Sequence, residues 1–188
     1  MRDPIWLTSE RLGLRRFTPD DFELLLVLCQ DPEINRFTGG PKSREKVEEL
    51  LRGRILAYYD EHPGLGIWAG VELATGKITG MHLLNHLHGE SDIQVGYVMF
   101  KEFWGRGYAT EMAVRLLRYG FADLKLPQIV AITDLPHVMS QKVLLKSGLH
   151  RKGERNLPHP AYAAANPLTW FERDAADWLK DDAARRAT

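Results

Sequence analysis

The pattern of apolar and polar residues is clearest between Tyr108 and Leu124. Counting from Ala109, apolar or small residues recur three, four, seven, eight and eleven positions later. This is the spacing of one face of an α-helix. The pattern therefore predicts an amphipathic helix over 108–124, with that face packed against a core.

Other helices are indicated by apolar runs with recognisable ends. Thr18 and Pro19 form a typical helix start before an almost entirely apolar run, so the helix that follows should be largely buried. Gly148 suits the C-terminal cap of another helix, and Asp174 can cap the last one. The predicted ranges are 22–29, 43–60, 138–146 and a short helix after residue 174.

Several shorter stretches between turn residues predict strands. Ala74–Gly76 has the composition of a hairpin turn between two of them. The predicted strands are 12–17, 67–73, 77–87, 91–100, 128–133, 150–155 and 168–173. Adjacent hairpin strands together with a strand–helix–strand crossover place the chain in the mixed α/β, or α+β, class.

Length and composition fit a single globular domain. The 188 residues suit one domain at roughly 100–200 residues each, so we expect a single domain over 1–188 with residues 1–8 and 181–188 peripheral or frayed. Hydrophobic residues make up 44% of the chain, which excludes a disordered protein. The 25 basic residues are balanced by 25 acidic ones, which weighs against a general nucleic-acid binder.

Cysteine content and apolar runs suggest where the protein works. Cys29 is the single cysteine, so the chain can form no internal disulfide and no multi-cysteine metal site. No apolar run approaches the roughly 20 residues of a membrane span, and the first residues lack the apolar stretch of a secretory signal. We therefore expect a soluble cytoplasmic protein with no membrane partner.

The segment that best indicates chemistry joins the strand 91–100 to the helix 108–124. Gly105 and Gly107 let backbone N–H groups approach a ligand, and the helix N-terminus adds partial positive charge. Together they predict an anion site for a phosphate or pyrophosphate. A nucleotide-binding Gly-Lys-Ser/Thr loop is absent, and Thr110 stands where a dinucleotide fingerprint needs glycine. The alternative is that the two glycines only make a tight turn.

The residues around these glycines carry a family resemblance. The segment 104–109 reads Trp-Gly-Arg-Gly-Tyr-Ala and resembles the acetyl-CoA loop of the GNAT N-acetyltransferase superfamily, (Gln/Arg)-x-x-Gly-x-(Gly/Ala). Trp104 stands where the general pattern has Gln or Arg, and a tryptophan there is similar to the RimJ/RimL-type branch of the family. Val-Gly-Tyr at 95–97 and the whole of 103–111 also resemble that branch. Residues 7–15 are similar to that branch's opening strand, and 134–149 to its later helix, with Ser140, Lys146 and Gly148 in register.

The resemblance implies a fold and a reaction. The fold would be the GNAT acyl-CoA N-acyltransferase fold, with a central, mostly antiparallel, splayed sheet flanked by helices. The reaction would move acetyl directly from acetyl-CoA to an amine without a metal, and a homodimer is possible. Acetyl-CoA would lie between strands 93–100 and 128–133. Its implied contacts are Tyr97, Val98, Met99, Trp104, Gly105, Arg106, Gly107, Tyr108, Ala109, Thr110, His137 and Ser140.

Three catalytic roles follow from the same resemblance. A backbone donor near Val98 would polarise the thioester carbonyl. Ser140 would donate a hydrogen bond or a proton to the leaving thiolate, unless it is only a serine in the first turn of a helix. His137 replaces the family's usual Asn; it can shape the site, take part in proton transfer or face solvent.

The acceptor side departs from the family at Gln94. Branch members often carry Glu there as a base, and Gln cannot accept a proton near neutral pH. A weak base would suit an α-amine, because at about pH 7.5 roughly a third of α-amines are neutral against roughly 0.1% of lysines. The replacement bases considered are Glu72, Asp92, His82, His86 and His88, the three histidines sharing one face of a strand opposite Met81, Leu83 and Leu87.

The acceptor is predicted to be a protein or peptide N-terminal α-amine. Phe37, Thr38, Trp68 and Gln94 are the predicted lining residues, although aromatic residues near a sheet are more often core. A polycationic acceptor would be bound by a cluster of carboxylates, and none stands out in the loop 37–40. A small-molecule amine, such as a polyamine or an antibiotic, and a module that binds acyl-CoA without turnover stay open as alternatives.

Overall fold

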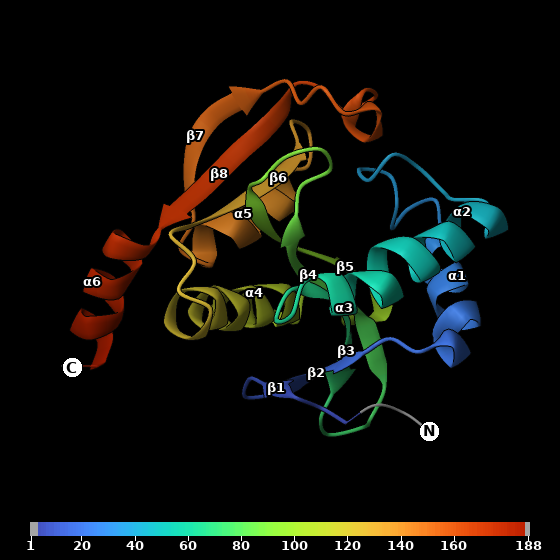
Figure 1. Ribbon diagram of the computed structural model, residues 1–188, viewed down its shortest axis with the longest axis horizontal. Helices are drawn as coiled ribbons and strands as arrows, with labels where there is room; N and C mark the ends of the chain where they lie inside the picture. Colours follow the sequence, from blue (N-terminus) through green and yellow to red (C-terminus); the bar gives the residue numbers. More distant parts are fainter. Residues whose placement is uncertain (1–3, 187–188) are drawn as a thin grey trace.

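The computed structural model describes residues 4–186, with side chains to Asp182. Eight strands form one sheet in the order β1-β2-β3-β4-β5-β6-β8-β7, with helices on both faces (Figure 1). The α+β class predicted from the sequence is confirmed. The strands are β1 (Leu7–Thr8), β2 (Leu12–Arg16), β3 (Gly66–Glu72), β4 (Ile78–His86), β5 (Ile93–Met99), β6 (Gln128–Asp134), β7 (His150–Arg155) and β8 (Leu168–Asp174).

The helices lie close to the predicted ranges. The charged segment 43–60 is one continuous helical stretch whose middle part, η2, is π-helical, and the long helix α4 also ends in a π-helical turn, η4. The helices are η1 (Pro19–Asp21), α1 (Phe22–Gln30), α2 (Arg44–Glu49), η2 (Leu50–Ala57), α3 (Tyr58–Glu61), η3 (Lys101–Phe103), α4 (Tyr108–Arg118), η4 (Tyr119–Asp123), α5 (Val138–Lys146), η5 (Pro160–Tyr162) and α6 (Ala175–Arg186).

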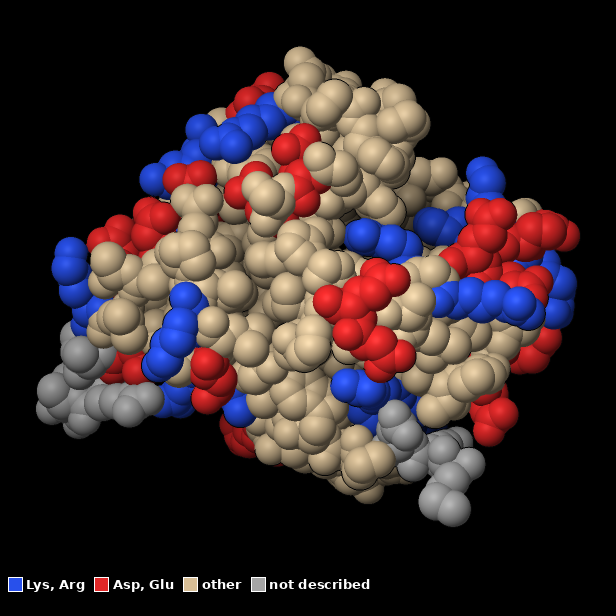
Figure 2. Space-filling view, viewed as in Figure 1, with Lys and Arg blue, Asp and Glu red and all other residues tan. Residues whose placement is uncertain are grey.

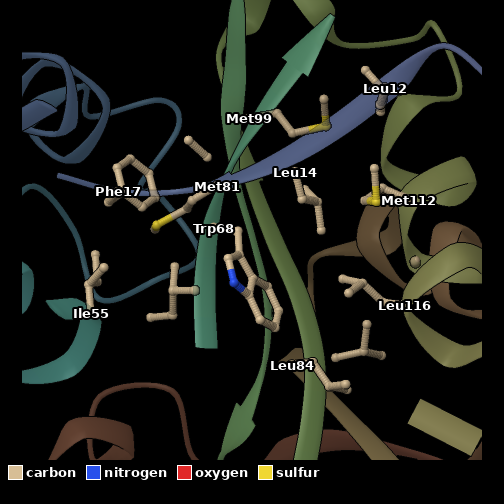
Figure 3. Close-up of a cluster of buried hydrophobic side chains, with 14 of the residues drawn as sticks. Leu12, Leu14, Phe17, Ile55, Trp68, Met81, Leu84, Met99, Met112 and Leu116 are labelled. Atoms are coloured by element: carbon tan, nitrogen blue, oxygen red, sulfur yellow. The ribbon is translucent and has the colours of Figure 1, made fainter. Parts of the chain in front are cut away.

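The core lies on both faces of the sheet, because β3 and β4 are covered from two sides. Figure 3 shows Phe17, Ile55 and Met81 on the side of η2, and Met112 and Leu116 of α4 on the other. All five side chains are buried. Each such side chain contributes roughly 1.5–3 kcal/mol when removed from water, so the sheet is held from both sides.

The two ends of the chain differ from the expectation in part. Leu7 is buried and pairs with Leu14, so residues 7 and 8 belong to the sheet rather than to a frayed end. The expectation for residues 1–3 and 187–188 lies outside the described residues. Helix α6 projects from the body of the fold (Figure 1), where Trp178 packs on Phe121 at 5.4 Å. No helix in the described part of the chain has the length and apolar character of a membrane span.

The sheet opens between β5 and β6. These strands run parallel and share a single paired position, Gln94 with Val130, whereas β4 and β5 pair continuously from Gly80 with Met99 to His86 with Ile93. The crossover between the parallel strands is made by α4. The predicted splay, which separates the ends of two neighbouring strands, therefore lies beside the start of α4.

Strand β4 corrects the expectation for its histidines. His82 faces Trp68 across the β3–β4 ladder and is fully buried, and burial lowers its pKa to about 4. Both faces of β4 are covered by other elements. The alternation of side chains along this strand therefore does not divide it into a buried face and an accessible face. His82 cannot be the base that the sequence left open.

Candidate functional site

The loop that enters α4 has the geometry of an anion site. Gly105 and Gly107 adopt left-handed backbone conformations, with φ of 73° and 79°. The Trp104 amide is bonded to Lys101 O and the Glu111 amide to Gly107 O, each at 3.0 Å. Between them, the amides from Gly105 to Thr110 have no acceptor within the described chain. The first amides of any helix lack an internal partner, and here the loop amides of Gly105 and Arg106 lack one as well. Free amides at a helix N-terminus can bind phosphate groups.

The side chain of Arg106 points away from this site. Its guanidinium lies 3.6 Å from the carboxylate of Glu72 and over the ring of Phe103. Glu72 also accepts from the hydroxyl of Tyr108 at 2.6 Å, and hydrogen bonds from Thr75 and Tyr108 lower its pKa. Glu72 is therefore a structural anchor of the loop rather than an available base, and Arg106 can reach an anion through its backbone amide only.

A cleft of about 470 Å³ runs from this loop along β5 to the segment after α1. Three basic side chains, Arg36, Lys142 and Lys146, also line it. Lys142 is a candidate cation from the sequence and Lys146 matches the family's helix, whereas Arg36 stands on an exposed loop where the sequence pattern gives no signal. The predicted residues that line the cleft are Phe37, Thr38, Tyr97, Val98, Met99, Trp104, Gly105, Gly107, Tyr108, Ala109, Thr110, His137 and Ser140.

Tyr97 and Ser140 meet in this cleft from β5 and α5. The Tyr97 hydroxyl lies 3.2 Å from Ser140 Oγ and 3.4 Å from the Ser140 carbonyl oxygen. Burial raises the pKa of Tyr97 to about 12, so this hydroxyl stays protonated in any physiological buffer. The sequence had identified Tyr97 as a backbone contact, and the structure adds its hydroxyl to the site.

Two backbone hydrogen bonds fix the direction of the amides on β5. Phe100 donates to Thr79 O at one end of the β4–β5 ladder and Leu87 donates to Asp92 O at the other, each at 3.0 Å. The antiparallel register between them is unbroken, so hydrogen-bonded pairs alternate along it. Even-numbered residues of β5 therefore turn their amides to β4, and odd-numbered ones turn them to β6.

This alternation corrects the prediction for Val98. Val98 stands opposite Met81 in a hydrogen-bonded pair, so its amide points to β4 rather than into the splay. The amides that point toward β6 are those of Tyr97 and Met99. The Met99 carbonyl on the same side already accepts from the indole Nε1 of Trp104 at 2.9 Å, which fixes that exposed tryptophan against the strand.

His137 and Phe37 form a stacked pair in the wall of the cleft. Their rings stack at 4.3 Å with an interplanar angle of 18°. Nδ1 of His137 lies 3.3 Å from Thr133 Oγ1, and burial lowers the pKa of the imidazole. A neutral imidazole held on both sides can donate or accept a hydrogen bond, and it is not a strong base.

Two predicted acceptor residues lie elsewhere. Trp68 is 3% exposed and lines a second cavity, where it packs against Trp6 at 5.1 Å. Gln94 donates through Nε2 to Asn85 Oδ1 at 3.2 Å. Neither side chain is among the described residues that line the cleft. Within the same described set, no group of three or more His, Cys, Asp or Glu side chains is placed to hold a metal ion.

Comparisons with known proteins agree with this geometry. Residues 11–150 match the family model described as an acetyltransferase (GNAT) domain. An uncharacterized N-acetyltransferase of Bacillus subtilis, YoaA, is 30% identical over 153 residues, which is 78% of this chain and 84% of that protein. An acetyltransferase of Agrobacterium tumefaciens has a similar structure, with a TM-score of 0.78, 23% identity and coverage of 92% and 95% of the two chains.

A further solved structure of similar fold holds coenzyme A. It is a spermidine N-acetyltransferase of Vibrio cholerae in complex with CoA and spermine, with a TM-score of 0.70 and 15% identity. The similarity covers 91% of this chain and 99% of that one. At this identity the comparison concerns the fold.

Proposed function

The chain belongs to the GNAT acetyltransferase family, and from that we propose that it moves an acetyl group from acetyl-CoA directly to an α-amine at the N-terminus of a peptide or protein. Membership makes the chain an acyltransferase, and its relatives include N-acetyltransferases. The observation that carries the proposal is a single cleft with unpaired amides at 105–110 at one end and the Tyr97–Ser140 hydroxyl pair on its wall.

The cleft offers a place for each part of acetyl-CoA. The diphosphate would lie on the amides from Gly105 to Thr110, with Lys142 and Lys146 adding positive charge nearby. The pantetheine arm would extend along β5, where the main-chain groups of Tyr97 point toward β6 without a strand partner beyond Gln94. The thioester would then reach the hydroxyls of Tyr97 and Ser140.

The chemistry needs a donor for the carbonyl and a donor for the sulfur. As the amine attacks the thioester carbon, a C–N bond forms and negative charge grows on the carbonyl oxygen, which the amide of Tyr97 or Met99 can stabilise. The C–S bond then breaks, and the thiolate accepts a hydrogen bond from Ser140, which is itself in contact with Tyr97. The amine proton leaves to solvent, because the pKa of His137 is lowered and that imidazole is a weak base.

The preference for an α-amine rests on the missing base. Gln94 is an amide held by Asn85, and the carboxylate that lines the cleft, Glu33, is in an ion pair with Lys101 at 3.1 Å. An amine that is already partly neutral needs no strong base, which favours α-amines with a pKa of roughly 8 over lysine. The Trp-Gly-x-Gly-Tyr-Ala-Thr-Glu segment and Val95–Tyr97 support placement in the RimJ/RimL-like branch.

A pair of peptides tests the acceptor. One has a free N-terminus and an acetylated internal lysine, and the other has an acetylated N-terminus and a free lysine. We expect CoA thiol release with the first peptide to exceed that with the second by at least about tenfold near pH 7.5. Equal rates, or a faster rate with the free lysine, would contradict the α-amine assignment. A thermal shift with acetyl-CoA in both cases would show that the donor site is intact.

A further inference from the structure

We infer that the acceptor carries a carboxylate close to its reacting amine, and that Arg54 of η2 receives it. The inference rests on the proposed function, because it concerns the acceptor side of the same site. It also excludes the polycationic acceptors that the sequence left open.

Arg54 is a half-buried cation without a carboxylate partner among the described residues. Its Nη2 donates to His86 O at 2.9 Å, and its guanidinium lies over the ring of Tyr58 at 5.6 Å. Arginines before it on the same helical stretch are paired, Arg44 with Glu23 and Arg52 with Glu48. Arg54 therefore keeps donors that neither backbone nor carboxylate uses, and a planar guanidinium suits a carboxylate ligand.

Hydroxyl groups and imidazoles lie close to this cation. The Tyr58 hydroxyl is 2.5 Å from His86 Nδ1, and the amide of His88 donates to the Tyr162 hydroxyl at 2.8 Å. Burial lowers the pKa of both histidines, that of His88 to about 4; His62, which packs on His86 at 4.8 Å, and then Arg54 lower that of His86 further. At neutral pH these imidazoles are neutral, so they add hydrogen-bonding capacity without repelling a ligand amine.

The nearby acidic groups do not cancel the charge of Arg54. Glu61 raises the pKa of the Tyr58 hydroxyl and Glu90 raises that of Tyr162, but Arg54 lowers both by more than these carboxylates raise them. Burial raises the pKa of each hydroxyl by more than any nearby charge changes it, and this effect of burial does not depend on the sign of those charges. At both hydroxyls the charge of Arg54 therefore outweighs that of the nearby carboxylate, which favours an anionic group over a polyamine there.

Arg54 lies where the sheet begins to open. Its acceptor His86 pairs with Ile93 on β5, and the next residue, Gln94, forms the single paired position between β5 and β6. Hydrogen bonds join η2, the β4–β5 hairpin and η5 here, from Arg54 to His86 O and from the His88 amide to the Tyr162 hydroxyl (Figure 1). Figure 2 shows basic side chains in the hollow between η2 and the segment around η5, whereas the acidic side chains over α3 face outward.

Binding of acetylated products to the CoA-saturated protein tests the inference without requiring turnover. The ligands are two pairs, each differing only in a carboxylate: N-acetyl-Ser-Glu-Ala amide against its Gln twin, and N-acetylalanine against N-acetylalaninamide. We expect the carboxylate member of at least one pair to bind at least about tenfold more tightly by calorimetry. The first pair represents an acidic peptide N-terminus and the second a free amino acid.

Variants of two neighbouring arginines make the test specific. Arg54→Gln should abolish the carboxylate preference. Arg54→Lys should reduce it, because lysine keeps the positive charge but lacks the planar pair of N–H donors that matches a carboxylate. Arg52→Gln, which removes an exposed ion pair on the same helix, should keep it. Equal affinity for both members of each pair, or a preference that survives Arg54→Gln, would overturn the inference.

The two proposals fail in different ways. If the Arg54-dependent preference is present and no amine releases CoA thiol, the acceptor site stands and the proposed reaction is wrong. If thiol is released with α-amines and no carboxylate preference exists, the reaction stands and the inference is wrong. A thermal shift by CoA in Arg54→Gln shows that this variant is folded.

Discussion

Arg11 and Glu111, one hundred residues apart, are joined by three contacts between 2.6 and 2.8 Å. The amide and Nε of Arg11 donate to the two carboxylate oxygens, and Nη2 lies 2.6 Å from Oε2. Nη1 of Arg11 also donates to Arg106 O at 3.1 Å. The turn between β1 and β2 thereby holds both the loop 104–107 and the first turn of α4, so a carboxylate beside an anion site is neutralised and serves as an anchor.

The first prediction concerns this anchor. Glu111→Gln should raise the Kd for CoA by roughly tenfold, because the loop loses its charge-assisted bonds to Arg11 and its free amides lose their fixed direction. Calorimetry with CoA measures the change. Glu48→Gln, which removes an exposed ion pair with Arg52, is the control and should leave the Kd unchanged. An unaltered Kd in Glu111→Gln would show that the loop keeps its shape without the pair.

The second prediction concerns the backbone of the loop. Gly107 has a φ of 79°, and Gly107→Ala should destabilise the protein by about 1–2 kcal/mol and weaken CoA binding, because an L side chain is strained there. Gly53→Ala is the matched control. Gly53 lies in a helix with no neighbour near an added Cβ, so this change should stabilise by about 0.5–1 kcal/mol. Denaturant unfolding measures both, and a neutral Gly107→Ala would contradict the strain.

The third prediction concerns the leaving group. Ser140→Ala should lower the rate of CoA thiol release by roughly 10- to 100-fold while the thermal shift with acetyl-CoA persists, because the thiolate loses a donor and the nucleotide contacts are untouched. Ser147→Ala is the control on the same segment; Ser147 bonds to Val143 O. Tyr97→Phe should act in the same direction as Ser140→Ala and not add fully to it. A normal rate in Ser140→Ala would remove the hydroxyl from the mechanism.

The sequence predicted the parts of this site that are local and missed those that depend on tertiary packing. Two glycines before an amphipathic helix are enough to indicate an anion-binding loop, and in the structure both glycines adopt left-handed conformations at the start of that helix. The amide direction at Val98 depends on the register with β4, and the position of Trp68 depends on its packing against Trp6. Arg54 gives no signal in sequence, because only the fold leaves it without a carboxylate.

The last prediction concerns the buried imidazole of His82 and the stability of the fold in acid. Burial lowers its pKa to about 4, and neither ring nitrogen has a partner among the described residues. In the unfolded chain the same side chain has a pKa of about 6.5. A group whose folded pKa is depressed contributes stability above its unfolded pKa and loses it as the pH falls toward its folded pKa.

The free energy of unfolding should therefore decrease between about pH 6.5 and pH 4, with His82 contributing a slope of up to about 1.4 kcal/mol per pH unit. His82→Leu should remove about one proton from the proton uptake on unfolding, because leucine does not titrate. The replaced ring has no hydrogen bond to lose, so the change does not leave a buried partner unsatisfied. Denaturant unfolding at several pH values measures the slope. An unchanged slope in His82→Leu would mean that His82 is protonated in the folded protein, and burial would then not determine its charge.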